Sequence, residues 1–170
     1  MPKRRIQKQR DGNQTIYIDS CFVDAYLWGD GDANKHAKKV FRKIKKTISS
    51  NPNIKVVIPF VAVGETVNTM IQKGKKDKND KMFELIEDLK ADTPPPSKTV
   101  IEIASAILDK DKMFDPTDAI IAAHALCSGY STYLLTTDTN MQTSKVLSEL
   151  EEDLGNNQKR KHKLKITDVF

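Results

Sequence analysis

Segments typical of β-strands alternate with segments typical of helices along most of the chain, and this alternation constrains the fold most. Short runs of β-branched and aromatic residues occupy 15–18, 55–58 and 133–136, and a final edge strand is expected at 164–167. Between them, apolar residues recur at helical spacing, as in residues 33–48 and 60–72. This order favours a parallel sheet that is covered by helices on both faces.

The expected helix starts carry residues that suit them. We expect Asp80 to cap a helix whose apolar stripe is Met82, Phe83, Ile86 and Leu89, and Ser97 to cap the next helix. Asp115 is the expected N-cap of a helix that starts at Pro116 and ends before Gly129. Because this last helix is apolar nearly all round, it is predicted to be buried.

The length of 170 residues suits one domain, which we place at residues 15–170 after a basic lead-in of residues 1–14. No apolar stretch is long enough to span a bilayer, and no signal-peptide core follows the basic N-terminus. We therefore expect a cytoplasmic protein with no membrane partner.

Cys21 and Cys127 lie in apolar runs, without a second ligand at metal-binding spacing, and are predicted to be buried reduced thiols.

The net charge is +5, and the basic residues are clustered in residues 3–10, 35–46, 73–81 and 159–165. Four such runs on one basic domain favour a polyanionic partner. The run on the expected helix 33–48 either follows a phosphate backbone or is solvated surface, and the sequence leaves both interpretations open. Its candidate RNA-backbone contacts are Lys38, Lys39, Arg42, Lys45 and Lys46.

Acidic residues follow two of the expected strands, Asp19 the first and Asp138 the third. Parallel strands bring their carboxyl ends to one edge of a sheet, so these two side chains should lie at the same edge. Asp118 lies in the first turn of a predicted helix and Glu65 lies inside another. If both helices start near that edge, four carboxylates converge, although a turn or helix-dipole role stays open for each aspartate.

Four carboxylates in a partly desolvated cleft would repel one another, by roughly 4 kcal/mol for a pair about 4 Å apart at an effective dielectric near 20. Divalent cations remove that repulsion, and a donor set made only of oxygens suits Mg²⁺ or Mn²⁺. Such an ion can activate water and stabilise the transition state of phosphodiester cleavage. On a basic domain, this pattern predicts a metal-dependent nuclease.

Four segments, in order, resemble the PIN domain family. Residues 16–20 resemble its opening strand with an Asp followed by Ser or Thr, and residues 64–67 resemble its helical glutamate segment. Residues 115–126 resemble its Asp-Ala-hydrophobic-Ile-Ala-Ala helix, which is the most specific of the four segments, and residues 134–138 resemble its last acidic strand. Within the family, the sequence looks like the VapC-like toxin ribonucleases of toxin–antitoxin pairs.

The resemblance implies a three-layer α/β/α fold with a mainly parallel sheet of about five short strands. It implies an endoribonuclease that depends on one or two Mg²⁺ or Mn²⁺ ions, with RNA as substrate, an antitoxin protein as partner and a homodimeric state. Catalytic and metal-binding roles are implied for Asp19, Glu65, Asp118 and Asp138. Asp115 is either a further metal ligand or only a helix cap, and Ser20 and Thr137 would support the site through hydrogen bonds.

The sequence departs from the family at residues 91–97, where the family's third strand should fall and where this chain is rich in proline. A non-catalytic PIN-fold protein that binds RNA or serves in assembly is the alternative, but it would have no use for all four acids. A receiver domain expects an acidic pair after its first strand, and a haloacid-dehalogenase-like phosphatase needs Asp-x-Asp, whereas Cys21 occupies the second position here.

Overall fold

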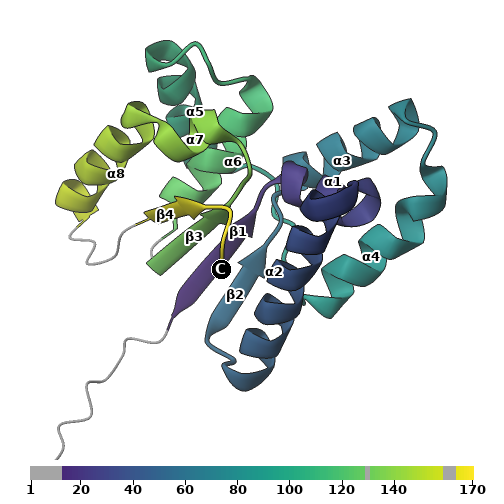
Figure 1. The fold of residues 1–170 in the computed structure, drawn as a ribbon. Helices are drawn as coiled ribbons and strands as arrows, with labels where there is room; N and C mark the ends of the chain where they lie inside the picture. The colour runs from purple at the N-terminus through teal and green to yellow at the C-terminus, as the bar shows by residue number, and fades with distance from the viewer. Residues whose placement is uncertain (1–12, 129–130, 159–163) are drawn as a thin grey trace, which may run out of the picture.

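The computed structural model describes residues 13–128, 131–158 and 164–170, and Figure 1 shows its fold. Four strands form one sheet in the order β2-β1-β3-β4, and every neighbouring pair is parallel. These strands are β1 (Gln14–Ile18), β2 (Ile54–Val57), β3 (Ser131–Leu135) and β4 (Leu164–Thr167). The parallel α/β prediction is confirmed, and the expected number of about five strands is corrected to four.

The position expected for a fifth strand holds a single bridge beside β2. The Asp92 N–H donates to the carbonyl of Val56 at 3.0 Å, and the Ile58 N–H donates to the carbonyl of Asp92 at 2.9 Å. Pairing does not continue because residues 94–96 are prolines, which have no N–H to donate to a ladder. The proline-rich segment therefore accounts for the shorter sheet.

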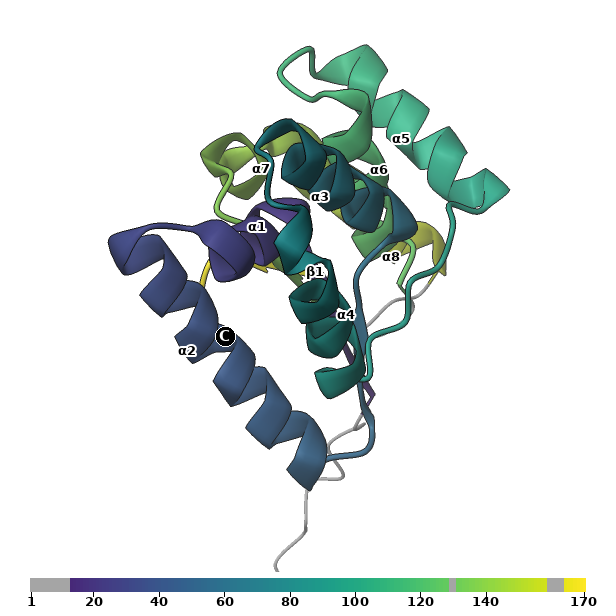
Figure 2. The same cartoon turned by 90° about the vertical axis from the view of Figure 1, so that its right-hand side faces the viewer.

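Helices cover both faces of the sheet. Figure 2 shows α1 and α2 on one side of it, α5, α6 and α8 on the other, and α3 and α4 toward the β2 edge. The helical elements, with one 3₁₀ turn, are α1 (Ser20–Trp28), α2 (Gly31–Ser50), α3 (Phe60–Gln72), η1 (Lys76–Lys78), α4 (Asn79–Asp88), α5 (Lys98–Lys110), α6 (Pro116–Leu126), α7 (Thr139–Thr143) and α8 (Lys145–Gln158).

The core lies between these layers, where β1 and α6 are the most deeply buried elements. Ile16 and Ile18 of β1 are fully buried, as are Ile121 and the alanines beside it in α6. The prediction that this helix is buried is confirmed, and its nearly uniform apolar sequence is the reason. None of the helices in the described residues has the length and apolar character that crossing a bilayer would require.

Two helices that the sequence patterns did not reveal begin directly after acidic residues. Helix α1 follows Asp19 at the end of β1, and helix α7 follows Asp138 shortly after β3. The Asp138 carboxylate accepts hydrogen bonds from the N–H groups of Asn140, at 2.7 Å, and Met141, at 3.4 Å, and so caps α7. These sharp strand-to-helix turns hold both aspartates at the carboxyl edge of the sheet.

Candidate active site

The carboxyl ends of β1 and β3 place Asp19 and Asp138 next to each other in the fold. Ile18 and Leu135 pair at the ends of the two strands, and the Asp19 N–H donates to the carbonyl of Leu135 at 3.0 Å. Asp19 is only 2% exposed, whereas Asp138 is half-buried. The strand pairing expected from the sequence therefore brings these two acids to the same edge.

Glu65 and Asp118 reach this edge from helices. Helix α3 starts just after β2 ends, and α6 runs back along the sheet so that its first turn lies at the carboxyl edge (Figure 1). Burial raises the pKa of Asp118 to about 7, and the charges of Asp19, Asp115, Asp138 and Glu65 all add to this rise. Since only nearby charges act strongly on a carboxyl group, these acids surround one point.

Asp19 is held by donors from three side chains. The Thr136 hydroxyl donates to Asp19 Oδ2 at 2.7 Å, and the Cys21 thiol donates to the same oxygen at 3.0 Å. The Ser20 hydroxyl lies 3.3 Å from Asp19 Oδ1. Burial raises the pKa of Asp19, and the hydrogen bonds from Cys21, Thr136 and Ser20 counteract part of that rise. The buried carboxylate is thus fixed in orientation.

Two of these hydroxyl groups also connect Asp19 to the other acids. Ser20 Oγ lies 2.7 Å from Glu65 Oε2, and with one hydrogen it donates to either Glu65 or Asp19 at a given moment. Thr136 Oγ1 accepts the backbone N–H of Asp138 at 3.0 Å. A chain of short contacts therefore links Glu65, Asp19 and Asp138.

Glu65 is half-buried in α3. Burial raises its pKa, the hydrogen bond from Ser20 opposes the rise, and the charges of Asp19 and Asp115 add to it. Asp115 is exposed and caps α6, because its Oδ1 accepts the Asp118 N–H at 2.9 Å. Asp115 thus combines a structural role with a negative charge close to Glu65 and Asp118.

Thr137 reaches the site through Cys21, because hydrogen bonds from both its side chain and its backbone lower the pKa of the Cys21 thiol, against the larger rise that burial causes. Its N–H donates to Cys21 Sγ at 3.2 Å, and its side chain is exposed. The hydroxyl that reaches Asp19 belongs to the preceding residue, Thr136, which is fully buried. Both Thr136 and Cys21 are absent from the residues selected by sequence, since a β-branched residue inside a strand and a cysteine in an apolar run look like ordinary core.

Asp24 is a further acid that the sequence patterns did not single out. It lies five residues after Asp19 on α1, and burial raises its pKa to about 6. The Thr66 hydroxyl and the charge of Lys73 oppose this rise, while the charges of Glu65 and Asp19 add to it. Within the described residues, neither Asp24 Oδ1 nor Thr66 Oγ1 has a hydrogen bond of normal geometry, although the two groups lie near each other.

The predicted RNA-backbone residues lie away from the carboxylates. They belong to α2, and only Lys38 of the five is half-buried; the others are exposed. The basic runs at residues 3–10 and 159–163 lie outside the described residues, as does most of the predicted lead-in. The candidate RNA-backbone residues thus come from α2, which carries none of Asp19, Glu65, Asp118 and Asp138; Figure 2 shows α2 beside α1.

The acidic side chains suit a hard divalent cation by their chemistry. The four acids offer only oxygen donors; burial raises the pKa of Asp19, and burial together with neighbouring negative charges raises the pKa values of Glu65 and Asp118. In residues 13–128, 131–158 and 164–170, no three His, Cys, Asp or Glu side chains are already spaced to hold a metal ion. Asp19, Glu65, Asp118 and Asp138 are the residues that would hold such an ion.

Comparison with known proteins identifies the family. A search of curated proteins finds no significant match. The PIN domain family matches residues 16–146, which is well over half of the chain and includes Asp19, Glu65, Asp118 and Asp138. Domains of this family are generally nucleases, in agreement with an acidic site at the carboxyl edge of a parallel sheet. The chain belongs to the PIN domain family.

Proposed function

We propose that this protein is an endoribonuclease that depends on a divalent cation, Mg²⁺ or Mn²⁺. The observation that carries the proposal is the convergence of Asp19, Glu65, Asp115 and Asp138 on Asp118, whose pKa they help to raise to about 7. A protein gains no stability from keeping this many like charges together in a half-buried place. A cation supplies the compensating charge, together with Lewis acidity toward the phosphodiester and the attacking water.

The residues of the site divide into a fixed part and an adjustable part. Asp19 is oriented by Thr136, Cys21 and Ser20, so it is the anchor around which the site is built. Glu65 and Asp118 are half-buried, and among the residues that the structure describes only Glu65 of the two has a side-chain donor, Ser20. In the proposal, Glu65 and Asp118 move toward Asp19 and Asp138 when the charge of a cation replaces their mutual repulsion.

The choice of RNA as substrate rests on charge and on the sequence resemblance. A net charge of +5 with clustered lysines and arginines favours a polyanion. A metal site made only of carboxylates can neutralise a phosphodiester in RNA or in DNA. The experiment below therefore compares the two nucleic acids directly.

The test is cleavage of a structured RNA and of a single-stranded DNA, each with Mg²⁺ or Mn²⁺ and each with EDTA. We expect RNA cleavage that EDTA abolishes. We also expect Asp118→Asn to lose activity by at least about 100-fold, because the substitution removes a ligand of the metal ion that would stabilise the transition state. The matched control is Asp109→Asn, an exposed acid of α5 away from the site. Full activity of Asp118→Asn, or cleavage in EDTA, would contradict the metal site, and cleavage of DNA alone would contradict the choice of substrate.

A toxin role, with an antitoxin partner and a homodimeric state, extends this proposal and rests on the resemblance of four segments to VapC-like toxins. Induced expression of the wild-type chain in a bacterial host should arrest growth, whereas Asp118→Asn should not. Equal growth of the two cultures at equal protein levels would reject the toxin role and leave the nuclease proposal standing.

A further inference from the structure

A groove of about 200 Å³ lies between α2 and α4, with α1 at one end. Tyr26 of α1 and Phe41 of α2 give it aromatic walls, and two leucines, Leu85 and Leu89, line the opposite side. The charged residues that line it are Lys38, Arg42, Lys45 and Asp88. The groove therefore combines a nearly buried apolar floor and one half-buried ring, that of Tyr26, with an excess of positive charge, a combination that suits nucleic acid.

Lys81, near the start of α4, is not part of the groove lining but lies beside it, against Tyr26. Its Nζ lies 4.7 Å from the centre of the Tyr26 ring. Burial and the charges of Lys38 and Lys78 lower its pKa, and the charge of Glu84 opposes this effect. In the described part of the chain, Lys38, Arg42 and Lys81 make no ion pair within 4.0 Å, so their charges remain available to a ligand although Glu84 and Asp88 lie nearby.

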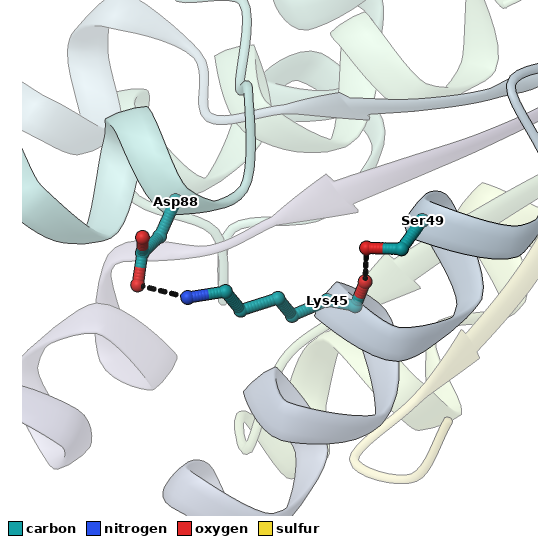
Figure 3. Close-up of polar contacts among 3 residues, drawn as sticks. All are labelled: Lys45, Ser49 and Asp88. Atoms are coloured by element: carbon teal, nitrogen blue, oxygen red, sulfur yellow. Dashed lines mark hydrogen bonds and ion pairs between the residues drawn. The ribbon is translucent and has the colours of Figure 1, made fainter.

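Lys45 differs from these three because an acid already neutralises it. Figure 3 shows Lys45 extending from α2 to Asp88 of α4, with 2.7 Å between Nζ and Oδ2. The Ser49 hydroxyl donates to the carbonyl of Lys45 at 2.8 Å in the same view. The Lys45–Asp88 pair thus joins the two helices across the groove, and the positive charge available to a ligand lies toward Lys38, Arg42 and Lys81.

Helix α1 connects this groove to the acidic site. Ser20, its first residue, contacts Glu65, and Tyr26 lies six residues later, about 9 Å along the helix axis at 1.5 Å per residue. Lys73 lies on the other face of α1, because its charge acts on Asp24 and its Nζ lies 5.9 Å from the Trp28 ring centre, and both of these residues are about 200° around the helix from Tyr26. Helix α1 thus places Tyr26 less than two turns from the contact between Ser20 and Glu65.

We propose that the groove between α2 and α4 binds a single-stranded segment of the RNA substrate, with phosphates at Lys38, Arg42 and Lys81. The inference rests on the proposed function, because it names the substrate that the acidic site cuts. The groove is too small to admit a duplex, whereas an extended strand offers single phosphates to the cations and an unpaired base to the half-buried Tyr26 ring. An acidic protein segment is the competing occupant.

The structure also separates the five predicted backbone contacts into two sets. Lys38, Arg42 and Lys45 share one face of α2 and line the groove, whereas Lys39 and Lys46 are exposed and lie outside its lining. This gives a matched control on the same helix. Replacement of Lys39, Lys43 and Lys46 by Ala removes the same amount of charge as replacement of Lys38, Arg42 and Lys81.

The experiment measures binding of a fluorescent single-stranded 12-nucleotide RNA by anisotropy, in EDTA and in the Asp118→Asn background, so that cleavage does not interfere. Because the groove triple variant lacks three phosphate-binding cations, it should bind roughly 100-fold more weakly at about 0.1 M salt, and the slope of log K against log salt should fall by about 2. The control triple variant should bind less than about 5-fold more weakly, and Asp88→Asn should bind RNA more tightly because it frees Lys45. Thermal unfolding curves of all variants verify that each one folds.

Equal effects of the two triple substitutions would overturn the proposal, and so would equal wild-type affinity for an RNA duplex of the same length. A poly-glutamate peptide is the second probe. If the groove variant binds that peptide more weakly but keeps its affinity for RNA, the groove is a protein-binding surface and the proposal is wrong. Groove-dependent RNA binding without RNA cleavage by the wild type would reject the proposed function alone, whereas cleavage without groove-dependent binding would reject this inference alone.

Discussion

Replacement of Asp118 by Asn should abolish function and at the same time stabilise the metal-free protein. In the folded chain the pKa of Asp118 is raised from 3.8 to about 7, first by burial and then by the charges of the surrounding acids. A carboxyl group with a raised folded pKa binds its proton more tightly when folded. Its effect on stability is therefore absent below pH 3.8 and becomes more unfavourable as the pH rises toward 7.

The magnitude follows from this pKa difference. At about 1.4 kcal/mol for each pH unit, ionised Asp118 would reduce the free energy of unfolding by at most about 4 kcal/mol. Because the side chain is only half-buried, solvent screening reduces the expected effect to about 2 kcal/mol. For a chain of this size, the Asn variant should then unfold about 4–8 °C above the wild type at pH 8 in EDTA.

The assay is thermal unfolding of wild type, Asp118→Asn and the exposed control Asp109→Asn, in EDTA, at pH 5 and at pH 8. The advantage of Asp118→Asn should be full at pH 8 and fall to a little over a third of that value at pH 5, because the penalty builds up between pH 3.8 and about pH 7. Millimolar Mg²⁺ should raise the Tm of the wild type at pH 8 more than that of the variant. An Asp118→Asn protein that unfolds at or below the wild-type temperature at pH 8 would refute the reasoning, as would an advantage that does not change with pH.

Three further predictions concern the same site. Thr136→Val should destabilise the protein by about 2 kcal/mol, because Asp19 loses its closest donor, whereas Thr136→Ser should retain most of the stability in urea unfolding. Asp115→Ala should lower the free energy of unfolding by about 1 kcal/mol through loss of the α6 cap, and Asp115→Asn should not, which thermal melts can compare. The rate of RNA cleavage at low Mg²⁺ should rise as Asp118 deprotonates near pH 7, and higher Mg²⁺ should move the midpoint to lower pH because cations and protons compete. A midpoint that does not move with Mg²⁺ would exclude this competition.

The features predicted well from the sequence are those that depend on local patterns. The helix that contains Asp118 carries its own N-cap in Asp115, Pro116 at its first position and a uniformly apolar body; α6 starts and is buried as predicted, and it ends at Leu126, one or two residues earlier than expected. The strand before Asp19 is recognised from its β-branched and aromatic residues, and the parallel sheet is recognised from the alternation of strands and helices along the chain. In such segments the local conformational preference of the residues agrees with the packing of the fold, so a single sequence is enough to predict the element.

The features missed from the sequence depend on contacts between distant residues. Thr136 becomes important only because β3 pairs with β1, which places its hydroxyl on Asp19, 117 positions away in the chain. The sequence pattern predicts Phe83 in the apolar stripe of its helix, but Phe83 is 57% exposed and Leu85 is buried, because α4 meets the core with a different face. Short helices such as α7 contain too few residues for their periodicity to be recognised.

The proline segment beside β2 also affects how two copies of this chain can meet. A strand at the border of a sheet usually offers its free backbone groups to any extended segment that approaches, and this is a common start of aggregation. Here Asp92 occupies the carboxyl end of β2, and the three prolines that soon follow present ring carbons in place of hydrogen-bond donors. This end of the sheet cannot recruit another strand, so a dimer that formed on this side would have to use helical surfaces.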